Sequence, residues 1–303
     1  MQVYNSACIS KGANPFDALL TASDQSEQAI QRLYENHRLA GYAQNCATFR
    51  SPKLAQQLRT DPILSALERA RTSSADADNI DTRHCLTLVA IPAPNAISLA
   101  QYIQSRLKNV APHLWFAPAA NMHLTLLELV VAKTEEDVEL ALGKLGAQRA
   151  GALVRYPGAH PTRLVRPRLN VDLGGLALSF VPEEKAAEKC GGDWKKDAAP
   201  FTYLHLRREL YALAADAGVK AQARYTVPSA HITLARFISA EDFNKSGEGE
   251  GSDMERISAF LRLVEAINDE LAELDCAWTV GEAGVELRKG KTWYGGGAVV
   301  CRA

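Results

Sequence analysis

A histidine and a threonine two positions apart occur twice in this sequence of 303 residues, each time inside an apolar run. The first run, NMHLTLLELV, covers residues 121–130, and the second, SAHITLARFI, covers residues 229–238. The residues concerned are His123 and Thr125 in the first run and His231 and Thr233 in the second. Because an unperturbed histidine titrates close to pH 7, each run carries a group that can give or take a proton there.

The apolar neighbours of these residues predict that both runs are β-strands. Side chains at positions i and i+2 of a strand point to the same face. The histidine and threonine therefore share one face of each run, while leucine and isoleucine point the other way, toward a core. A single histidine in an apolar strand is most often a hydrogen-bonded core residue. Two such pairs, in matched apolar surroundings and in two similar units of the chain, instead favour a function for both.

Two imidazoles and two hydroxyls suit the hydrolysis of a cyclic phosphodiester. A neutral histidine can take a proton from the water that attacks phosphorus, and a protonated histidine can donate to the departing ribose oxygen. Threonine hydroxyls can donate hydrogen bonds to the phosphoryl oxygens, which carry the negative charge. This chemistry requires no metal ion and no cofactor, and we expect none. The sequence leaves open which histidine is the base and which is the acid.

The stretches H-L-T-L and H-I-T-L resemble the paired H-x-[ST]-x motifs of the 2H phosphoesterase superfamily, which includes 2'-5' RNA ligase-like proteins, cyclic phosphodiesterases and RNA-end processing enzymes. The resemblance covers residues 80–303, and both motifs match without substitution. It implies an α+β fold of two pseudo-symmetric lobes, each of antiparallel sheet plus helices, around a central cleft. It also implies metal-independent action on 2',3'-cyclic phosphates. The catalytic positions that it implies are those of His123, Thr125, His231 and Thr233.

Residues 1–80 are predicted to form an N-terminal helical extension and linker, and residues 81–303 the 2H phosphoesterase-like domain. The helix signals are Asn14 with Pro15, a capping box at Asp24 and Glu27, and further helices at 51–58 and 62–69. A small, polar stretch at 72–82 is typical of a linker. The extension resembles that of fungal members of the superfamily.

From residue 84 onward, the pattern predicts alternating strands and helices. Strands are expected at 84–92, 115–131, 224–238, 277–288 and 292–301, with two more within 162–181. Helices are expected at 95–109, 134–150, 201–217 and 254–274, with loops at 183–199 and 244–253. This order amounts to two similar units, each carrying one His-x-Thr strand.

The stretch ELRKGKTWYGGG, residues 286–297, mixes basic and aromatic residues near the C-terminus. We expect Trp293 and Tyr294 to form a rim that stacks a base and binds substrate, and family members often place an aromatic residue of a late strand near the cleft. The alternative is a basic turn leading into a strand, with one aromatic side chain buried.

The stretch RLVRPRLNVD, residues 163–172, places Arg166 and Arg168 on one face if it is extended. Both arginines could bind a terminal phosphate of the substrate. The favoured alternative is a solvated edge strand, because Pro167 cannot donate to a neighbouring strand.

Composition limits the partners and the compartment. A net charge of −1 provides no positive field for long nucleic acid, so a short chain or only its end is expected to bind. Six scattered cysteines without a C-x-x-C pair favour a reducing compartment and argue against a cysteine-based zinc site. With no signal-peptide pattern and no long apolar run, we expect a soluble, monomeric protein of the cytoplasm or nucleus that binds no membrane.

These observations together predict an enzyme that hydrolyses 2',3'-cyclic nucleotides or the 2',3'-cyclic phosphate ends of RNA. Three alternatives stay open. The same scaffold can act as an RNA 3'-end exonuclease, as a 2'-5' RNA ligase, or as a binding module for nucleotides or RNA ends. Intact histidines and threonines in both motifs argue against the binding module, because pure binding needs no pair of proton-transferring groups.

Overall fold

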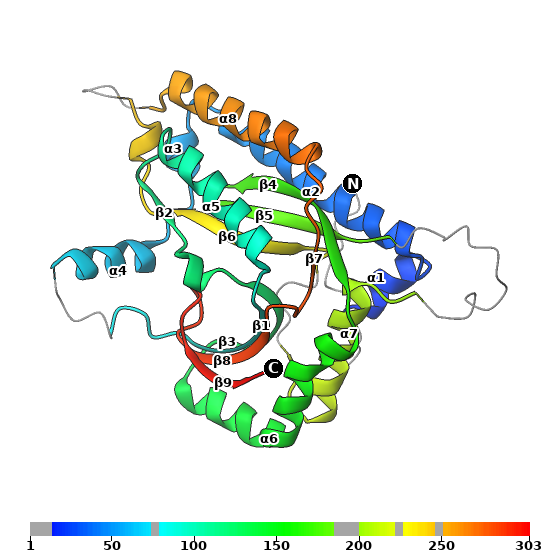
Figure 1. Ribbon diagram of the computed structural model, residues 1–303. Helices are drawn as coiled ribbons and strands as arrows, with labels where there is room; N and C mark the ends of the chain where they lie inside the picture. Colours follow the sequence, from blue (N-terminus) through cyan, green and yellow to red (C-terminus); the bar gives the residue numbers. More distant parts are fainter. Residues whose placement is uncertain (1–13, 74–78, 185–199, 222–226, 246–250) are drawn as a thin grey trace, which may run out of the picture.

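The computed structural model describes residues 14–73, 79–184, 200–221, 227–245 and 251–303, in which helices flank a nine-stranded antiparallel sheet (Figure 1). The strands are β1 (His84–Ala90), β2 (Leu114–Phe116), β3 (Leu124–Lys133), β4 (Arg163–Asp172), β5 (Gly175–Pro182), β6 (Ala230–Phe237), β7 (Trp278–Thr279), β8 (Val285–Gly290) and β9 (Ala298–Arg302). The helices are α1 (Asp17–Ala22), α2 (Glu27–Phe49), α3 (Leu54–Gln57), α4 (Pro62–Ser73), α5 (Pro94–Lys108), α6 (Glu135–Ala159), α7 (Tyr203–Asp216) and α8 (Met254–Ala272). The predicted α+β class is confirmed.

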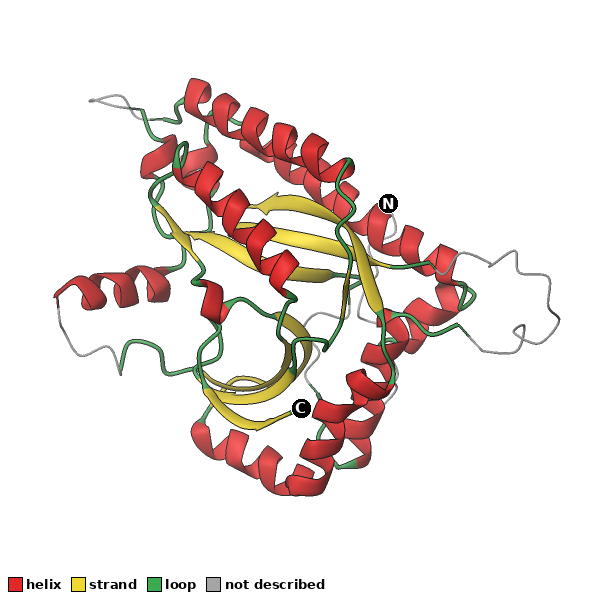
Figure 2. Ribbon diagram, viewed as in Figure 1, coloured by secondary structure: helices red, strands yellow, loops and turns green. Residues whose placement is uncertain are grey.

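The sheet consists of two halves that meet at the two motif strands. Its strand order is β7-β4-β5-β6-β3-β1-β8-β9, and β2 pairs with the end of β6. Within the described residues, one pair, Leu124 with Ile232, joins β3 to β6. Figure 2 shows the strands in two groups, one across the upper part of the view and one curled below it. The sheet is continuous across this junction, so the fold has two half-sheets and not two separate sheets.

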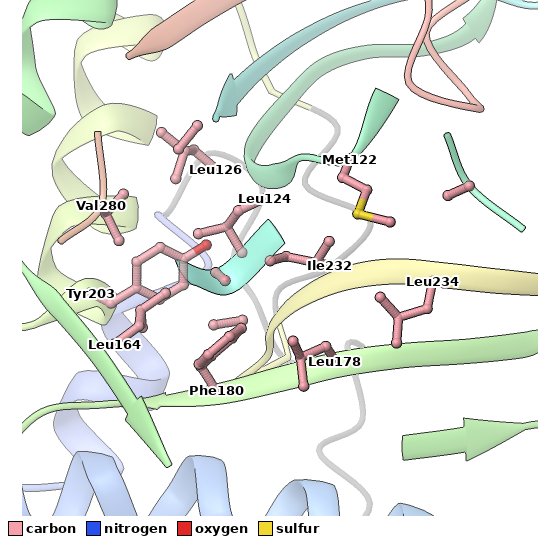
Figure 3. Packing of buried hydrophobic residues seen from close by; sticks show 14 of the residues in the cluster. Met122, Leu124, Leu126, Leu164, Leu178, Phe180, Tyr203, Ile232, Leu234 and Val280 are labelled. Atoms are coloured by element: carbon pink, nitrogen blue, oxygen red, sulfur yellow. The ribbon is translucent and has the colours of Figure 1, made fainter. Parts of the chain in front are cut away.

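Buried leucine and isoleucine side chains fill the space behind the motif strands. Leu124 and Leu126 of β3 and Ile232 and Leu234 of β6 are at most 1% exposed. Figure 3 shows these side chains gathered in one cluster with the ring of Tyr203 from α7. Each such side chain contributes about 2 kcal/mol by leaving water. The apolar residues beside each His-x-Thr pair therefore hold the strands in place, as the alternation in the sequence predicts.

The helices cover both half-sheets. In one half, α6 packs against β1, β3, β8 and β9, and α7 packs against β3. In the other half, α8 packs against β4, α5 against β6, and the N-terminal helix α2 against β4 and β5. Buried Gln31 of α2 donates to the carbonyl of Pro182 at 2.8 Å, which fixes this helix to the end of β5. The N-terminal helices are therefore present as predicted, and α2 is attached to the second half-sheet.

The start of α2 differs from the predicted capping box. Asp24 and Gln25 both have left-handed backbone angles, with φ of 49° and 52°. Ser26 is the N-cap, and its side chain accepts from the backbone N–H of Ala29. The box at Asp24 and Glu27 is therefore wrong, because the turn before the helix places Asp24 outside it.

Helix α6 is longer than predicted and contains a kink. It runs to Ala159, and Gly146 inside it has a φ of 67°. A glycine reaches this conformation without the steric cost of a Cβ.

No helix among the described residues is long and apolar enough to cross a membrane. The predicted loop at 183–199 lies from 185 onward outside the described residues, as does the centre of the loop at 244–253.

Candidate active site

The four residues of the two motifs line one cleft, here called the motif cleft, with a volume of about 690 Å³ out to its open mouth. An antiparallel register continued from the Leu124–Ile232 pair puts His123 opposite Thr233, and Thr125 opposite His231. In an ideal antiparallel pair, diagonal positions lie about 7–8 Å apart. Each histidine lies one position from the Leu124–Ile232 pair, and the positive charge of His123 lowers the pKa of His231, so the two rings are neighbours in one cleft.

The ring of His123 is oriented by the backbone just before β3. A 3₁₀ turn, Ala119–Asn121, precedes the strand, and His123 Nδ1 lies 2.8 Å from the carbonyl oxygen of Asn121. Because a carbonyl only accepts hydrogen bonds, Nδ1 carries the proton in this pairing. In the neutral ring, Nε2 is then the nitrogen that can take a proton from a ligand.

The ring of His231 has a different partner. It lies inside β6, and its Nδ1 is 2.9 Å from the hydroxyl oxygen of Ser229. A hydroxyl can donate or accept, so this contact is compatible with either neutral form of the ring. The two histidines therefore share a motif but have unequal hydrogen-bond partners.

The protein surroundings lower the pKa of both histidines. Burial is the main cause for each ring, because the charged form is disfavoured away from water. The neighbouring His123 and Arg207 contribute for His231, whose pKa falls to about 4. The positive charges of Arg288 and Arg236 contribute for His123, against the opposing effect of its Asn121 hydrogen bond. Both rings are therefore neutral at pH 7 without a ligand, and an anionic phosphate would raise both pKa values.

Trp293 and Tyr294, the two aromatic residues expected from the sequence to bind substrate, line the motif cleft together with Trp115. The rings of Trp115 and Tyr294 meet edge to face, with centroids 6.0 Å apart. Arg83 lies 4.3 Å from the centroid of the Trp293 ring. These aromatic faces form one wall of the cleft.

The Tyr294 hydroxyl is held by groups outside the aromatic wall. It donates to Asp61, with both carboxylate oxygens 2.8 Å away, and accepts from Arg83 at 3.0 Å. Burial and the bond to Asp61 raise the pKa of Tyr294 well above its usual range. Asp61 belongs to the N-terminal extension, so the extension helps to position a residue of the cleft.

A glycine turn packs directly on the backbone that orients His123. Gly295 has a φ of 85°, and a Cβ there would overlap the carbonyl oxygen of Asn121. The Asn121 side chain donates to the carbonyl of Tyr294 at 3.2 Å. Buried Arg288 donates to the carbonyl of Gly295 at 2.7 Å and is paired with Glu286. Gly295, the first glycine of the triplet, therefore allows the turn to lie in close contact with the backbone of Asn121.

Arg166 and Arg168 lie elsewhere in the structure. Arg166 has a φ of 53° at a register shift in β4, and its carbonyl accepts from Arg38. The Arg168 guanidinium lies 4.9 Å from the centroid of the Tyr42 ring. Neither arginine lines the motif cleft. Since β4 pairs with β7 only near its start, the structure fits the edge-strand interpretation and does not bring these arginines to the candidate site.

Two charged residues of the cleft, Glu128 and Arg236, were not predicted from the sequence. Each lies five positions after its histidine, where strict alternation would place it on the apolar face. In each strand one residue, Leu126 or Leu234, has no opposite partner in the ladder. Such a β-bulge shifts the following residues by one position. Burial alternates identically in both copies, and the bulges turn Glu128 and Arg236 toward the cleft.

Buried side chains donate hydrogen bonds to the carbonyl groups that the two bulges expose. Arg207 of α7 donates to the carbonyl of Leu126 at 3.2 Å. Gln104 of α5 donates to the carbonyl of Leu234 at 2.9 Å. The Leu234 carbonyl also accepts from the backbone N–H of Ala117 at 2.9 Å, so both carbonyls that the bulges turn away from the ladder have hydrogen-bond partners in the interior. The matching offset of a charged residue after each His-x-Thr was the one sequence signal for this arrangement.

Among the described residues, no three histidine, cysteine, aspartate or glutamate side chains come together in a way that could hold a metal ion. Arg236, which lies in the motif strand β6, has no acidic partner within the described part of the chain. It lies 5.6 Å from the centroid of the Tyr294 ring. The cleft thus combines two neutral imidazoles, two hydroxyls and an available guanidinium.

No family model and no curated protein matches the sequence. Several solved structures are similar at low identity. Apo LigT from E. coli is 14% identical, with a TM-score of 0.36, 73% of this chain covered and 97% of that one. The protein TT0787 of Thermus thermophilus is 14% identical, with a TM-score of 0.39 and coverage of 72% and 96%. A structure described as a phosphoesterase is 14% identical, with a TM-score of 0.32 and coverage of 73% and 97%.

The two named sources, E. coli and Thermus thermophilus, are bacteria, so the narrower resemblance of the N-terminal helices to fungal members is not supported. The TM-scores of all three structures lie below 0.5. The chemistry that can take place here rests on the motif cleft itself.

Proposed function

We propose that this protein is a 2H-type phosphoesterase that opens 2',3'-cyclic phosphodiesters of nucleotides or RNA ends. The observation that carries the proposal is the meeting of the two His-x-Thr pairs in one cleft, at the residue pair that joins the half-sheets. Two groups able to transfer protons and two hydroxyl donors then surround one volume. That is the set of groups that hydrolysis of a cyclic phosphodiester needs.

The unequal partners of the histidines suggest their roles. The Asn121 carbonyl stabilises a protonated His123, because it accepts a hydrogen bond from the charged ring. His231 has the pKa of about 4 and stays neutral near pH 7. We therefore assign His231 as the general base and His123, protonated once the anionic substrate is bound, as the general acid.

The reaction then proceeds by a balanced transfer of two protons. His231 takes a proton from water as the water oxygen bonds to phosphorus. The bond from phosphorus to one ribose oxygen breaks, and that oxygen takes a proton from His123. Thr125 and Thr233 donate hydrogen bonds to the non-bridging oxygens, and Arg236 adds positive charge where negative charge increases. Exchange with solvent restores both rings.

The aromatic wall supplies a place for the nucleoside. A base stacked on an aromatic side chain contributes about 1–3 kcal/mol and needs no particular sequence. Trp115, Trp293 and Tyr294 are the aromatic residues of the cleft. We assign them to the base and ribose of the reacting nucleotide, with Tyr294 fixed by Asp61 and Arg83.

The test is to incubate the full chain with 2',3'-cyclic nucleotides and with a cyclic-phosphate-ended oligonucleotide, in EDTA, and to identify the product. We expect hydrolysis of at least one substrate to a single phosphate isomer, with EDTA without effect. Activity that EDTA abolishes and zinc or manganese restores would contradict the proposed mechanism. Shortening of an oligonucleotide from its 3' end, joining of two ends, or binding without turnover would instead support the exonuclease, the ligase or the binding module.

A further inference from the structure

A second hollow adjoins the motif cleft on the His231 side. It has a volume of about 1300 Å³ out to its open mouth, and it shares His231, Thr233 and Arg236 with the motif cleft. Helix α2 forms one wall, and the β4–β5 hairpin with β6 forms the other. This hollow is called the α2 groove below. The part of the groove that is comparable with known cavities is about 420 Å³, within the ~300–1,000 Å³ usual for one small molecule, so the groove has room for one nucleotide-sized group beside the motif cleft.

The wall from the N-terminal extension is polar and firmly placed. His37, Gly41 and Asn45 follow one another at intervals of four along α2, so they lie on one helical face. Arg38, 8% exposed, donates to the carbonyls of Arg166 at 2.7 Å and Ser179 at 3.4 Å. These bonds tie α2 to both strands of the hairpin. The wall is therefore a fixed part of the groove.

The charge of the α2 groove is positive. Arg59 and Arg236 line it, and neither forms an ion pair within the described part of the chain. Arg59 is anchored through its backbone N–H, which donates to the carbonyl of Leu173 at 2.7 Å. The acidic residue of the lining, Asp172, accepts from the backbone N–H groups of Gly174 and Gly175. The groove thus offers two available guanidinium groups to an anion.

We propose that the α2 groove binds the RNA segment adjoining the reactive phosphate, so that the substrate is a short RNA chain and not a free mononucleotide. This inference rests on the proposed function of the motif cleft. Arg59 would contact a backbone phosphate, while the amides of Asn45 and Asn170 would contact ribose or base edges. The shared residues give the chain a continuous path from the groove to His231. A free cyclic mononucleotide would fill the motif cleft and leave the groove empty.

The experiment compares kcat/KM for a 2',3'-cyclic mononucleotide with kcat/KM for a trinucleotide that ends in a 2',3'-cyclic phosphate. The wild-type chain should prefer the trinucleotide. The preference is the kcat/KM for the trinucleotide divided by the kcat/KM for the mononucleotide. Arg59→Ala should lower this ratio by about 5- to 20-fold, because one charge-assisted phosphate contact is lost. Arg59→Lys should restore part of the ratio, and Asn45→Asp should lower it by adding a negative charge to the wall.

The matched control is Arg149→Ala. It removes an exposed arginine of α6, the helix that packs against the other half-sheet, and should leave the ratio unchanged. A wild-type chain without preference for the trinucleotide, or an Arg59→Ala variant with an unchanged ratio, would overturn the proposal.

If neither substrate is turned over, the proposed function fails, and binding tests the groove separately. A 5'-labelled trinucleotide ending in a 3'-phosphate, followed by fluorescence anisotropy, should bind Arg59→Ala more weakly than wild type. It should also show a smaller salt dependence of binding in the variant, because fewer counterions are released. Equal affinities and equal salt dependence in the two proteins would overturn the groove assignment.

Discussion

The two motif strands have the same local architecture but different electrostatics. Both carry the His-x-Thr pair, a bulge at the same position and a charged residue five positions after the histidine. That charged residue is Glu128 in the first strand and Arg236 in the second. The histidine faces a carbonyl in the first strand and a hydroxyl in the second. A repeated frame can therefore hold two histidines in matching places while their surroundings give them different roles.

The difference extends to what supports each histidine. The backbone that orients His123 is packed against the glycine turn at residues 292–297. His231 instead lies within β6, beside the α2 groove. Changes in the C-terminal glycine turn should thus affect mainly the first motif, and changes in α2 should affect mainly the second, whose histidine lines the α2 groove. The predictions below test this division.

The largest effects are expected from the histidines. His123→Ala and His231→Ala should each lower kcat by about 10²–10⁴-fold, the usual share of one general acid or base. The wild-type rate should be bell-shaped in pH, since one ring must be neutral and the other protonated. The limb at lower pH should depend on His231 and the limb at higher pH on His123. As a control, His84→Ala at the start of β1 should keep both the rate and the profile. Wild-type rates in both motif variants would refute the assignment.

Substitutions of the charged residue after each bulge should have clearly different effects on kcat/KM in the two strands. Arg236→Gln should lower kcat/KM by about 10- to 100-fold, because the transition state loses a positive charge. Glu128→Gln, at the matching position, should change kcat/KM by less than about 3-fold, since a carboxylate gives an anionic phosphate no favourable contact. Steady-state kinetics on one substrate measures both. Equal losses of kcat/KM in the two variants would mean that the positive charge of Arg236 does not stabilise the transition state.

Gly295→Ala should act through His123. A Cβ at this position displaces the Asn121 carbonyl, and with it the ring that the carbonyl orients. We expect kcat to fall by about 10-fold, with the higher-pH limb of the profile shifted and the lower-pH limb in place. Circular dichroism checks that the variant is folded. Gly297→Ala, in the same turn but without contact to Asn121, is the comparison, and an equal kinetic loss there would argue against a specific route through His123.

The threonines should contribute less than the histidines. Thr125→Val and Thr233→Val each remove one of several hydrogen-bond donors to the phosphoryl oxygens, so kcat should fall by about 3- to 10-fold. The pH profile should keep both limbs. Thr125→Ser and Thr233→Ser retain the hydroxyl and should recover most of the rate. A valine variant as slow as the histidine variants would assign the hydroxyl a role in proton transfer.

The smallest effect concerns stability against acid. His231 has a pKa of about 4 in the folded chain, below the ordinary value of about 6.5 in an unfolded chain. Between pH 4 and pH 6.5 the unfolded state therefore binds more protons than the folded state. The free energy of unfolding should fall as the pH drops from 6.5 toward 4. His231→Gln should reduce this loss by an amount on the order of 1 kcal/mol, measured by urea unfolding at several pH values. An identical pH dependence in variant and wild type would contradict the lowered pKa.

Much of the second half-sheet could be predicted because its signals are local. The hairpin of β4 and β5 follows from two apolar runs around Gly174 and Gly175, and α8 follows from its helical periodicity. The start of α2 was mispredicted because Asp24 and Ser26 are both good caps. Their backbone angles, which depend on how α1 meets the rest of the chain, decide between them.

By itself, the sequence determined that each histidine shares a strand face with its threonine, because the alternation of side chains is a property of the strand backbone. It also determined the core face, since leucine and isoleucine gain free energy by leaving water whatever they pack against. Tertiary structure alone decided the rest of the site. A bulge exists only relative to a partner strand, so β1 and β5 turn Glu128 and Arg236 into the cleft. The hydrogen bond from the Arg59 backbone to Leu173 likewise brings Arg59 to the groove that His231 also lines, and β5 separates β4, which carries Arg166 and Arg168, from the motif strand β6.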